Sequence, residues 1–291
     1  MVETYVYFDA LRVLAVVPIF AYASYLDIQE RRVPHKTWYP LGVVGTIALV
    51  ADLLLRPEDP GTVLMFLAIS FTLGVVFGYG FYYLGTFGGA DRYALVVIGF
   101  AFPIYPFLGT QFEAFVVPEL PVFVLSVLGN TVLAGIAYPL KLFGENLVKR
   151  NTANPLLMLL AKRVSTDTLH DEFGRVLGTD DDVSIRRSGV FGATEGVTDI
   201  DFVRDYVEWR GVESIRDARD MDLRLQDFVN STPWMSDNIE RDAEELREIA
   251  EQDAVWISPG IPFIVPMFVG IVVALTAGDV LFALMRAVFG L

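Results

Sequence analysis

The sequence predicts an all-α membrane protein of six transmembrane helices, with a small α+β domain between the fifth helix and the sixth. Its 291 residues are 54% hydrophobic, a higher share than an ordinary soluble domain carries. The apolar residues gather in runs of about 20, which is the length of a helix that crosses a bilayer. One long stretch, residues 141–258, is polar instead and predicts a soluble domain.

The apolar runs are expected to be helices, because lipid offers no partner to unpaired backbone groups. The six predicted spans are residues 5–26, 38–55, 61–84, 93–110, 119–140 and 260–288. This organisation divides the chain into a five-span segment, a soluble insert and a last span, at residues 1–140, 141–258 and 259–291.

Basic residues beside membrane ends predict which face is cytoplasmic. They follow the first, third and fifth spans, and they are Arg31, Arg32, Lys36, Arg92, Lys141, Lys149, Arg150, Lys162 and Arg163. The loops after these spans, and with them residues 141–258, are therefore predicted to be cytoplasmic in a multi-pass protein of the cell membrane. Both termini are then expected outside.

Within the insert, residues 198–211 read as a short helix that is capped at Thr198 or Asp199 and ends at Gly211. Residues 236–252 read as a longer amphipathic helix, and residues 173–197 as turns and short strands. Three consecutive aspartates at 180–182 could bind a cation, although a solvated turn is the favoured interpretation.

Composition excludes several classes of protein. The net charge is −14, and residues 141–258 alone hold 25 acidic against 15 basic side chains. Such acidity disfavours nucleic-acid binding and suits a protein that works in concentrated salt, although an ordinary acidic surface is an alternative. No cysteine is present, which excludes disulfides and thiolate sites, and His35 and His170 are the only histidines. We therefore expect no metal and no cofactor.

Carboxylates near membrane spans are the candidate functional groups, because they are costly there. Asp9 and Asp279 are expected to reach water at the outer ends of their spans, and Asp52 to lie near the outer end of the second span, whereas Asp27 and Asp91 fall at one cytoplasmic face. Two neighbouring carboxylates cannot both ionise easily, so one keeps its proton. The ionised one can activate water and the protonated one can polarise a carbonyl, which is peptide hydrolysis by an aspartic pair.

Small residues precede the second aspartate. Gly88, Gly89 and Ala90 leave room for a close approach of backbone or substrate to the Asp91 carboxylate. An alternative role for Asp91 is the N-cap of the fourth span, and for Asp27 that of a polar residue beside the membrane.

Two stretches resemble the signatures of type IV prepilin and archaeal preflagellin peptidases, which are GxGD-type membrane aspartic proteases. "SYLDIQERRVPH" resembles the first, with Tyr25 before Asp27 and the pair Val33 and Pro34 after it. "FGGAD" resembles the second, with Ala90 in place of its second glycine. "PGIPFIVP", at 259–266, resembles the element that opens the last span in this family. The resemblance leaves residues 141–258 unexplained, as a variable insert.

The resemblance implies an endopeptidase that removes the short basic leader from prepilins and preflagellins at the cytoplasmic membrane face. It implies that Asp27 and Asp91 are catalytic, and that the partners are leader peptides and the lipid bilayer. Many bacterial members carry a cysteine-rich loop and also methylate the new amino terminus. This chain has no cysteine, and is similar to the archaeal branch that acts as a peptidase only; the salt-adapted acidity of a halophilic archaeon agrees.

Two alternatives stay open. A presenilin-like or signal-peptide-peptidase-like protease shares the Gly-x-Gly-Asp pattern but usually adds a Pro-Ala-Leu element, which this chain lacks. A transporter could use the same acids as ion sites, but such sites usually lie near the membrane midplane.

Overall fold

A computed structural model describes residues 5–56, 58–83, 88–108, 121–178, 199–218, 227–228, 246–259 and 262–290. The chain forms two compact units. The first comprises Met1–Ala137 together with Pro262–Leu291, and the second comprises Tyr138–Ile261.

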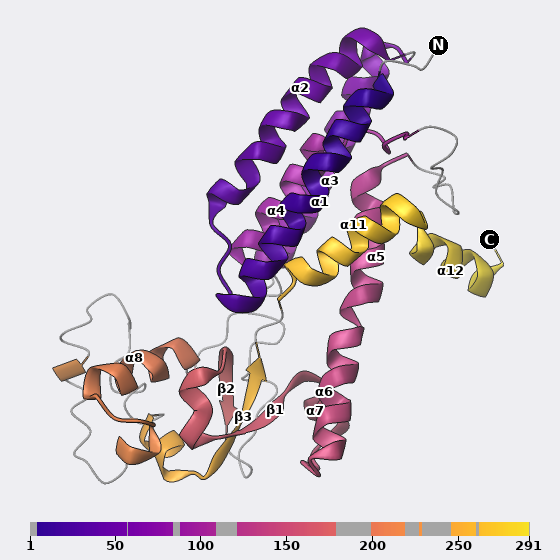
Figure 1. Ribbon diagram of the computed structural model, residues 1–291. Coiled ribbons are helices and arrows are strands. Elements are labelled where there is room, and N and C mark those ends of the chain that lie inside the picture. Colours follow the sequence, from indigo (N-terminus) through magenta and orange to yellow (C-terminus); the bar gives the residue numbers. More distant parts are fainter. Residues whose placement is uncertain are drawn as a thin grey trace. The chain divides into compact units, whose positions relative to one another are not determined.

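The first unit is helical (Figure 1). Its elements are α1 (Tyr5–Gln29), a short 3-10 helix η1 (His35–Trp38), α2 (Tyr39–Leu55), α3 (Pro60–Tyr83), α4 (Gly89–Ala101), α5 (Phe123–Gly135), α11 (Ile264–Thr276) and α12 (Val280–Phe289). Four helical stretches are long and apolar enough to cross a membrane: Tyr5–Gln29, His35–Leu55, Pro60–Tyr83 and Phe123–Val148. The membrane-helix prediction is confirmed for these four, and the number six is not.

The predicted fourth span, 93–110, is only partly helical. α4 has 13 residues, which extend about 20 Å and not the roughly 30 Å of a hydrocarbon core. Pro103 cannot donate a hydrogen bond and disfavours helical backbone at Phe102, so the helix ends there. The irregular segment that follows is satisfied by protein groups: Ser70 Oγ donates to the Pro103 carbonyl at 2.8 Å, and the Tyr105 N–H donates to the Pro121 carbonyl at 2.9 Å.

The predicted last span, 260–288, is broken into α11 and α12. Gly278 adopts a left-handed φ of 91°, and the Asp279 carboxylate caps α12 by accepting a hydrogen bond from the Phe282 N–H. Asp279 was expected to reach water, but it is 5% exposed because Ser126 of α5 also donates to it. Asn130 holds both sides of the break, donating to the Gly278 carbonyl and accepting from the Val280 N–H.

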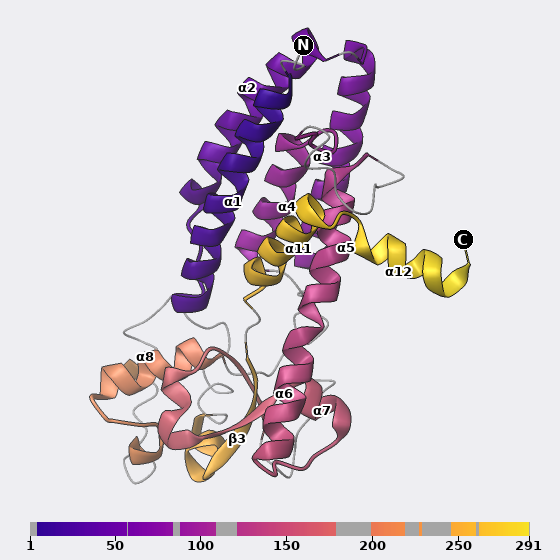
Figure 2. The same ribbon diagram turned by 45° about the vertical axis from the view of Figure 1, so that its right-hand side comes forward.

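Beyond this break, α12 leaves the helix bundle. None of its ten described residues is buried, and it points away from the neighbouring helices in both views (Figures 1 and 2).

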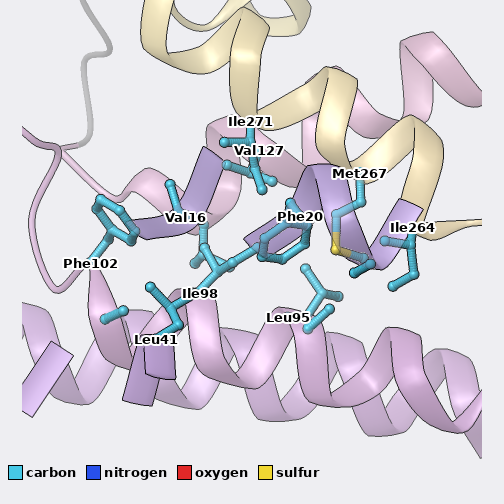
Figure 3. Packing of buried hydrophobic residues seen from close by; sticks show 14 of the residues in the cluster. Val16, Phe20, Leu41, Leu95, Ile98, Phe102, Val127, Ile264, Met267 and Ile271 are labelled. Atoms are coloured by element: carbon cyan, nitrogen blue, oxygen red, sulfur yellow. The ribbon is translucent and has the colours of Figure 1, made fainter. Parts of the chain in front are cut away.

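An apolar core joins the helices of the first unit (Figure 3). α1, α2, α4, α5 and α11 all contribute to it, through residues that include Val16, Phe20, Leu41, Leu95, Ile98, Val127, Met267 and Ile271. Phe20 also packs on Trp38 of η1, with ring centroids 5.1 Å apart. The end of α1 and the start of α2 are thereby held against α4 and α11.

Glycines bring α3 and α4 into close contact. A Cβ added at Gly74 would lie 2.7 Å from the Leu95 carbonyl oxygen, and one added at Gly78 would lie 2.8 Å from the Arg92 carbonyl oxygen. Only glycine permits such an approach of two helix backbones. Because Arg92 lies in the first turn of α4, the contact at Gly78 holds the start of that helix against α3.

A ring of four charges joins the other ends of α1 and α2. Arg12 donates to Asp9 at 2.7 Å and to Asp52 at 2.5 Å, and Arg56 donates to Asp9 at 2.5 Å and to Asp52 at 2.8 Å. The expectation that Asp9 reaches water was wrong, because Asp9 is 1% exposed, and Asp52 is likewise buried at 2%. Each carboxylate is covered by an arginine from its own helix and one from the neighbouring helix.

The second unit combines helices with a small sheet. Its elements are α6 (Ala137–Val148), α7 (Pro155–Leu160), β1 (Lys162–Ser165), η3 (Thr166–Asp171), β2 (Gly174–Gly178), α8 (Ile200–Arg210), η4 (Arg216–Ala218) and β3 (Ala254–Pro259). The sheet is antiparallel in the order β1-β3-β2, with Val164 opposite Val255 and Val176 opposite Ile257. The α+β prediction for this segment is confirmed.

The predicted short helix of this unit is confirmed in both of its caps. Asp199 accepts from the Asp201 N–H, and Gly211 ends α8 in the left-handed conformation. The buried face of α8 packs with strand residues around Val203 and Tyr206. Of the predicted amphipathic helix, residues 246–251 are helical and 236–245 lie outside the described residues, as do the aspartates at 180–182.

Candidate active site

Asp27 lies in the last turn of α1 and is half-buried. Its Oδ2 accepts a hydrogen bond from the backbone N–H of Ile264 at 3.1 Å. Ile264 is the first residue of α11, and its carbonyl accepts from Ser24 Oγ at 3.4 Å. The end of α1 and the start of α11 therefore hold the Asp27 carboxylate between them.

Asp91 lies in the first turn of α4 and is 7% exposed. Its Oδ2 accepts from the backbone N–H of Gly88 at 2.7 Å, in the manner of a capping box. The residue at the N-cap is Gly88, so the alternative that Asp91 is itself the N-cap was wrong. The same carboxylate nevertheless satisfies one backbone donor of the helix start.

The two glycines before Asp91 differ in their surroundings. A Cβ added at Gly88 would lie 3.3 Å from Asp91 Oδ2, whereas one added at Gly89 would meet no described atom within 4 Å. Gly88 has φ −75°, which any residue adopts, so the reason for glycine there is space and not backbone conformation. Ala90 is partly buried against the apolar core.

Asp27 and Asp91 come from different helices and lie close enough for the charge of one to act on the other. Their surroundings are unequal. Asp27 is reached from water and accepts the first amide of a helix, whereas Asp91 is almost enclosed. An interacting carboxylate pair with unequal surroundings is the arrangement in which one group holds a proton and the other a charge.

The remaining residues of the first motif shape the turn after Asp27. Arg31 adopts a left-handed φ of 52°, which reverses the chain after α1. Val33 is buried in the core and Pro34 precedes η1 with φ −61°, so the pair anchors the start of the second helix. Tyr25 is 60% exposed and does not take part in the core, whereas the next residue, Leu26, is buried.

A groove of about 850 Å³ lies between η1, α2 and α4. Its lining is mainly apolar, with His35 and Tyr93 forming a polar part where their rings meet edge to face, 4.7 Å apart. The lining residues are His35, Trp38, Tyr39, Gly42, Val43, Thr46, Tyr93, Val96, Val97 and Phe100. Sequence patterns alone predicted neither this groove nor the hydrogen bond that the Ile264 N–H donates to Asp27.

Among the residues that the structure describes, no group of three histidine, aspartate or glutamate side chains is placed to hold a metal ion. The groups that the described site does present are the Asp27 and Asp91 carboxylates and the backbone amides of Ile264 and Gly88.

Comparison with protein families decides the relationship of the chain. Residues 14–140 match the type IV leader peptidase family, and residues 153–280 match the C-terminal region described as archaeal peptidase A24 C-terminus, type II. The chain belongs to the type IV leader peptidase family. The protein is thus a peptidase, and with its long apolar helices it is a membrane protein.

The second match corrects one interpretation of the sequence. Residues 141–258 were expected to be a variable insert that the family resemblance does not cover, but most of them fall within the archaeal C-terminal region of this leader peptidase family. The comparison with curated proteins gave no match.

Proposed function

We propose that this leader peptidase is an aspartic endopeptidase that removes the short basic leader from prepilins and preflagellins at the cytoplasmic face of the membrane. The observation that carries the proposal is that the two motif aspartates, Asp27 from α1 and Asp91 from α4, lie within range of each other's charge and each accept a hydrogen bond from one backbone amide. Family membership supplies the reaction class, and this geometry supplies the catalytic groups.

In the proposed mechanism, Asp27 is the general base. Its carboxylate accepts a hydrogen bond from the Ile264 N–H. This amide lies at the N-terminus of α11, where the helix dipole stabilises a negative charge. Asp91 is enclosed, and its Oδ2 is occupied by Gly88, which leaves Oδ1 to carry the proton that polarises the scissile carbonyl. Asp27 takes a proton from water as the water attacks, and returns it to the leaving amine as the C–N bond breaks.

The proposed membrane arrangement has six crossings. The non-helical residues 102–108 continue the fourth, and α11 with α12 form the sixth. Basic residues after α1 and after Phe123–Val148 support a cytoplasmic aspartate pair and a cytoplasmic second unit. The domain limits 1–140, 141–258 and 259–291, and an external position for both termini, are part of this proposal. A reporter fused at residue 58 that reads cytoplasmic would overturn it.

The groove is the proposed site for the start of the substrate's hydrophobic segment. Its α4 wall repeats at Tyr93, Val96, Val97 and Phe100, and its α2 wall repeats at Tyr39, Gly42, Val43 and Thr46. Both walls thus show the i, i+3, i+4, i+7 spacing of one helix face, which suits a groove that takes an apolar helix. Tyr93 begins the α4 wall two residues after Asp91, so the groove starts at the same end of α4 as that aspartate, although the two side chains leave the helix about 200° apart.

The deciding experiment is cleavage of a prepilin and a preflagellin by membranes that contain this protein, with the product mass measured. Loss of the leader at the edge of the hydrophobic segment is the expected result. A cut inside that segment would favour the presenilin-like alternative instead. Intact substrate, in membranes where the protein accumulates, would overturn the proposed activity.

A further inference from the structure

Arg92, the residue after Asp91, lies among three tyrosines. Its guanidinium carbon is 4.0 Å from the ring centroid of Tyr82, 4.8 Å from that of Tyr93 and 5.2 Å from that of Tyr79. Nη2 also lies 3.3 Å from the Tyr93 hydroxyl, to which it donates. Tyr79 and Tyr82 belong to the last turns of α3, so the side chain of Arg92 reaches from α4 to α3.

The backbone of Arg92 is fixed at the same place, because Gly78 of α3 packs on its carbonyl. Successive residues of an α-helix point about 100° apart. The Arg92 side chain therefore faces the tyrosines while Asp91, its neighbour, faces Gly88 and Asp27. Within the described part of the chain, the guanidinium makes no ion pair with a carboxylate.

The Arg92 guanidinium has two possible partners, the tyrosine rings and the Asp91 carboxylate. Adjacent helix residues do not face each other, but a long arginine side chain that is not held elsewhere can bend back to a neighbouring carboxylate, and an ion pair favours the charged form of the acid. Attraction to the faces of three aromatic rings competes with a partly solvated ion pair. The tyrosines thus keep the cation away from the carboxyl group that has to hold a proton.

We propose that Arg92 is a positioning residue, which the tyrosines Tyr79, Tyr82 and Tyr93 hold against α3 so that the first turn of α4 is fixed and Asp91 stays without a cation. The inference rests on the proposed function, in which Asp91 is catalytic. Released from the rings, the guanidinium would pair with Asp91 and keep it ionised, so that the acid could not donate its proton.

The other charged groups around Asp91 are few. α1 contributes Asp27, with Arg31 acting on that aspartate, and η1 contributes His35 through its contact with Tyr93. α3 contributes the tyrosines, and α5 and α11 carry no charged side chain. Apart from the tyrosine that is replaced, none of these groups changes in the variants below, and Tyr82→Phe controls for the loss of the hydroxyl, so a shift in pH dependence reports on Arg92.

The test compares Tyr82→Leu with Tyr82→Phe in the full-length protein in membranes, with prepilin cleavage measured as kcat and KM across pH. The Phe variant keeps the ring and should match the wild type. The Leu variant should lose roughly tenfold in kcat with little change in KM, and the alkaline limb of its kcat profile should move to lower pH. In the double variant Tyr82→Leu/Arg92→Gln the alkaline limb should return to its wild-type pH, because the Arg92 guanidinium is no longer present.

An unshifted alkaline limb in Tyr82→Leu would overturn the proposal, as would a shift that survives in the double variant. If Tyr82→Leu does not accumulate in the membrane, Tyr79→Leu, which removes the ring at 5.2 Å, should move the alkaline limb in the same direction by a smaller amount, and an unmoved limb there would overturn the proposal. Asp91→Asn is measured in parallel. Full cleavage by Asp91→Asn would overturn the proposed function as well, whereas an inactive Asp91→Asn beside a normal Tyr82→Leu would overturn the role of Arg92 alone.

Discussion

The backbone N–H of Ile264 donates a hydrogen bond to the carboxylate of Asp27 across 237 residues of sequence. The two residues belong to the first and the penultimate helix of the described chain. The candidate site is therefore complete only when α11, which follows the second unit in sequence, has packed beside α1.

Replacing either aspartate with asparagine should abolish leader cleavage, by at least about a thousandfold in rate. Asparagine still accepts from the Ile264 or Gly88 amide, so both variants should accumulate, but it cannot exchange a proton with water. The double variant should be no worse than either single one, because the two acids act as a unit. Asp279→Asn, which keeps the cap on α12, is the control; wild-type cleavage by Asp91→Asn would refute the aspartic mechanism.

Lengthening the side chains tests the geometry rather than the chemistry. Asp27→Glu and Asp91→Glu keep a carboxylate but displace it by about one methylene, and catalytic groups tolerate about 0.5 Å. We expect a large loss of kcat at both positions, and a larger one at Asp91, because that side chain is enclosed and held at 2.7 Å from the Gly88 nitrogen. Equal losses would show that the enclosure of Asp91 does not matter for catalysis.

Alanine substitutions at the neighbouring Gly88 and Gly89 give a test variant and its control. Gly88→Ala places a methyl group 3.3 Å from Asp91 Oδ2, a contact tight enough to displace the carboxylate, and should lower kcat roughly tenfold. Gly89→Ala meets no described atom within 4 Å and should stay close to the wild type. Initial rates on a prepilin, normalised to the amount of peptidase in the membrane, decide between the two. The reverse order of effects would contradict the role given to Gly88.

A bulky side chain in the groove should interfere with substrate binding. Gly42 lines the groove and an added Cβ there meets no described atom within 4 Å, so Gly42→Leu fills space that the substrate is proposed to use. KM should rise several-fold while kcat changes little. Gly80→Leu, at an equally open position on α3 outside the groove lining, is the control. An unchanged KM in Gly42→Leu would place the hydrophobic segment elsewhere.

Breaking the charge ring should affect stability and not chemistry. Asp52→Asn leaves Arg12 and Arg56 with one carboxylate between them, and loss of a buried ion-pair partner costs about 3–5 kcal/mol. Thermal inactivation should occur at a lower temperature, while the rate per folded molecule should stay near the wild type. A selective loss of kcat in a stable Asp52→Asn protein would mean that the ring communicates with the aspartate pair.

The sequence predicted the long membrane helices and the α+β character of the second unit, because apolar runs and helix caps are local signals. The end of α4 was missed although Pro103 is a local signal for it, whereas the break after α11 could not be predicted, because it depends on the Asn130 contacts at Gly278. The two motif aspartates could be named because their neighbours form a pattern. The groups that contact Asp27 and Arg92 could not be named from the sequence, because tertiary packing brings Ile264 and Tyr79 to them.

The ring of Asp9, Arg12, Asp52 and Arg56 also bears on how the protein enters the bilayer. α1 carries Asp9 and Arg12 three residues apart, and α2 ends with Asp52 and Arg56 four residues apart, so each helix can neutralise its own charges during insertion. The bonds between Arg12 and Asp52 and between Arg56 and Asp9 form only when the two helices meet in one register. The charges of the ring sum to zero, and when the two helices meet each carboxylate gains a second arginine while it keeps its first, so pairing of the first two helices is strengthened without any ring charge losing its partner.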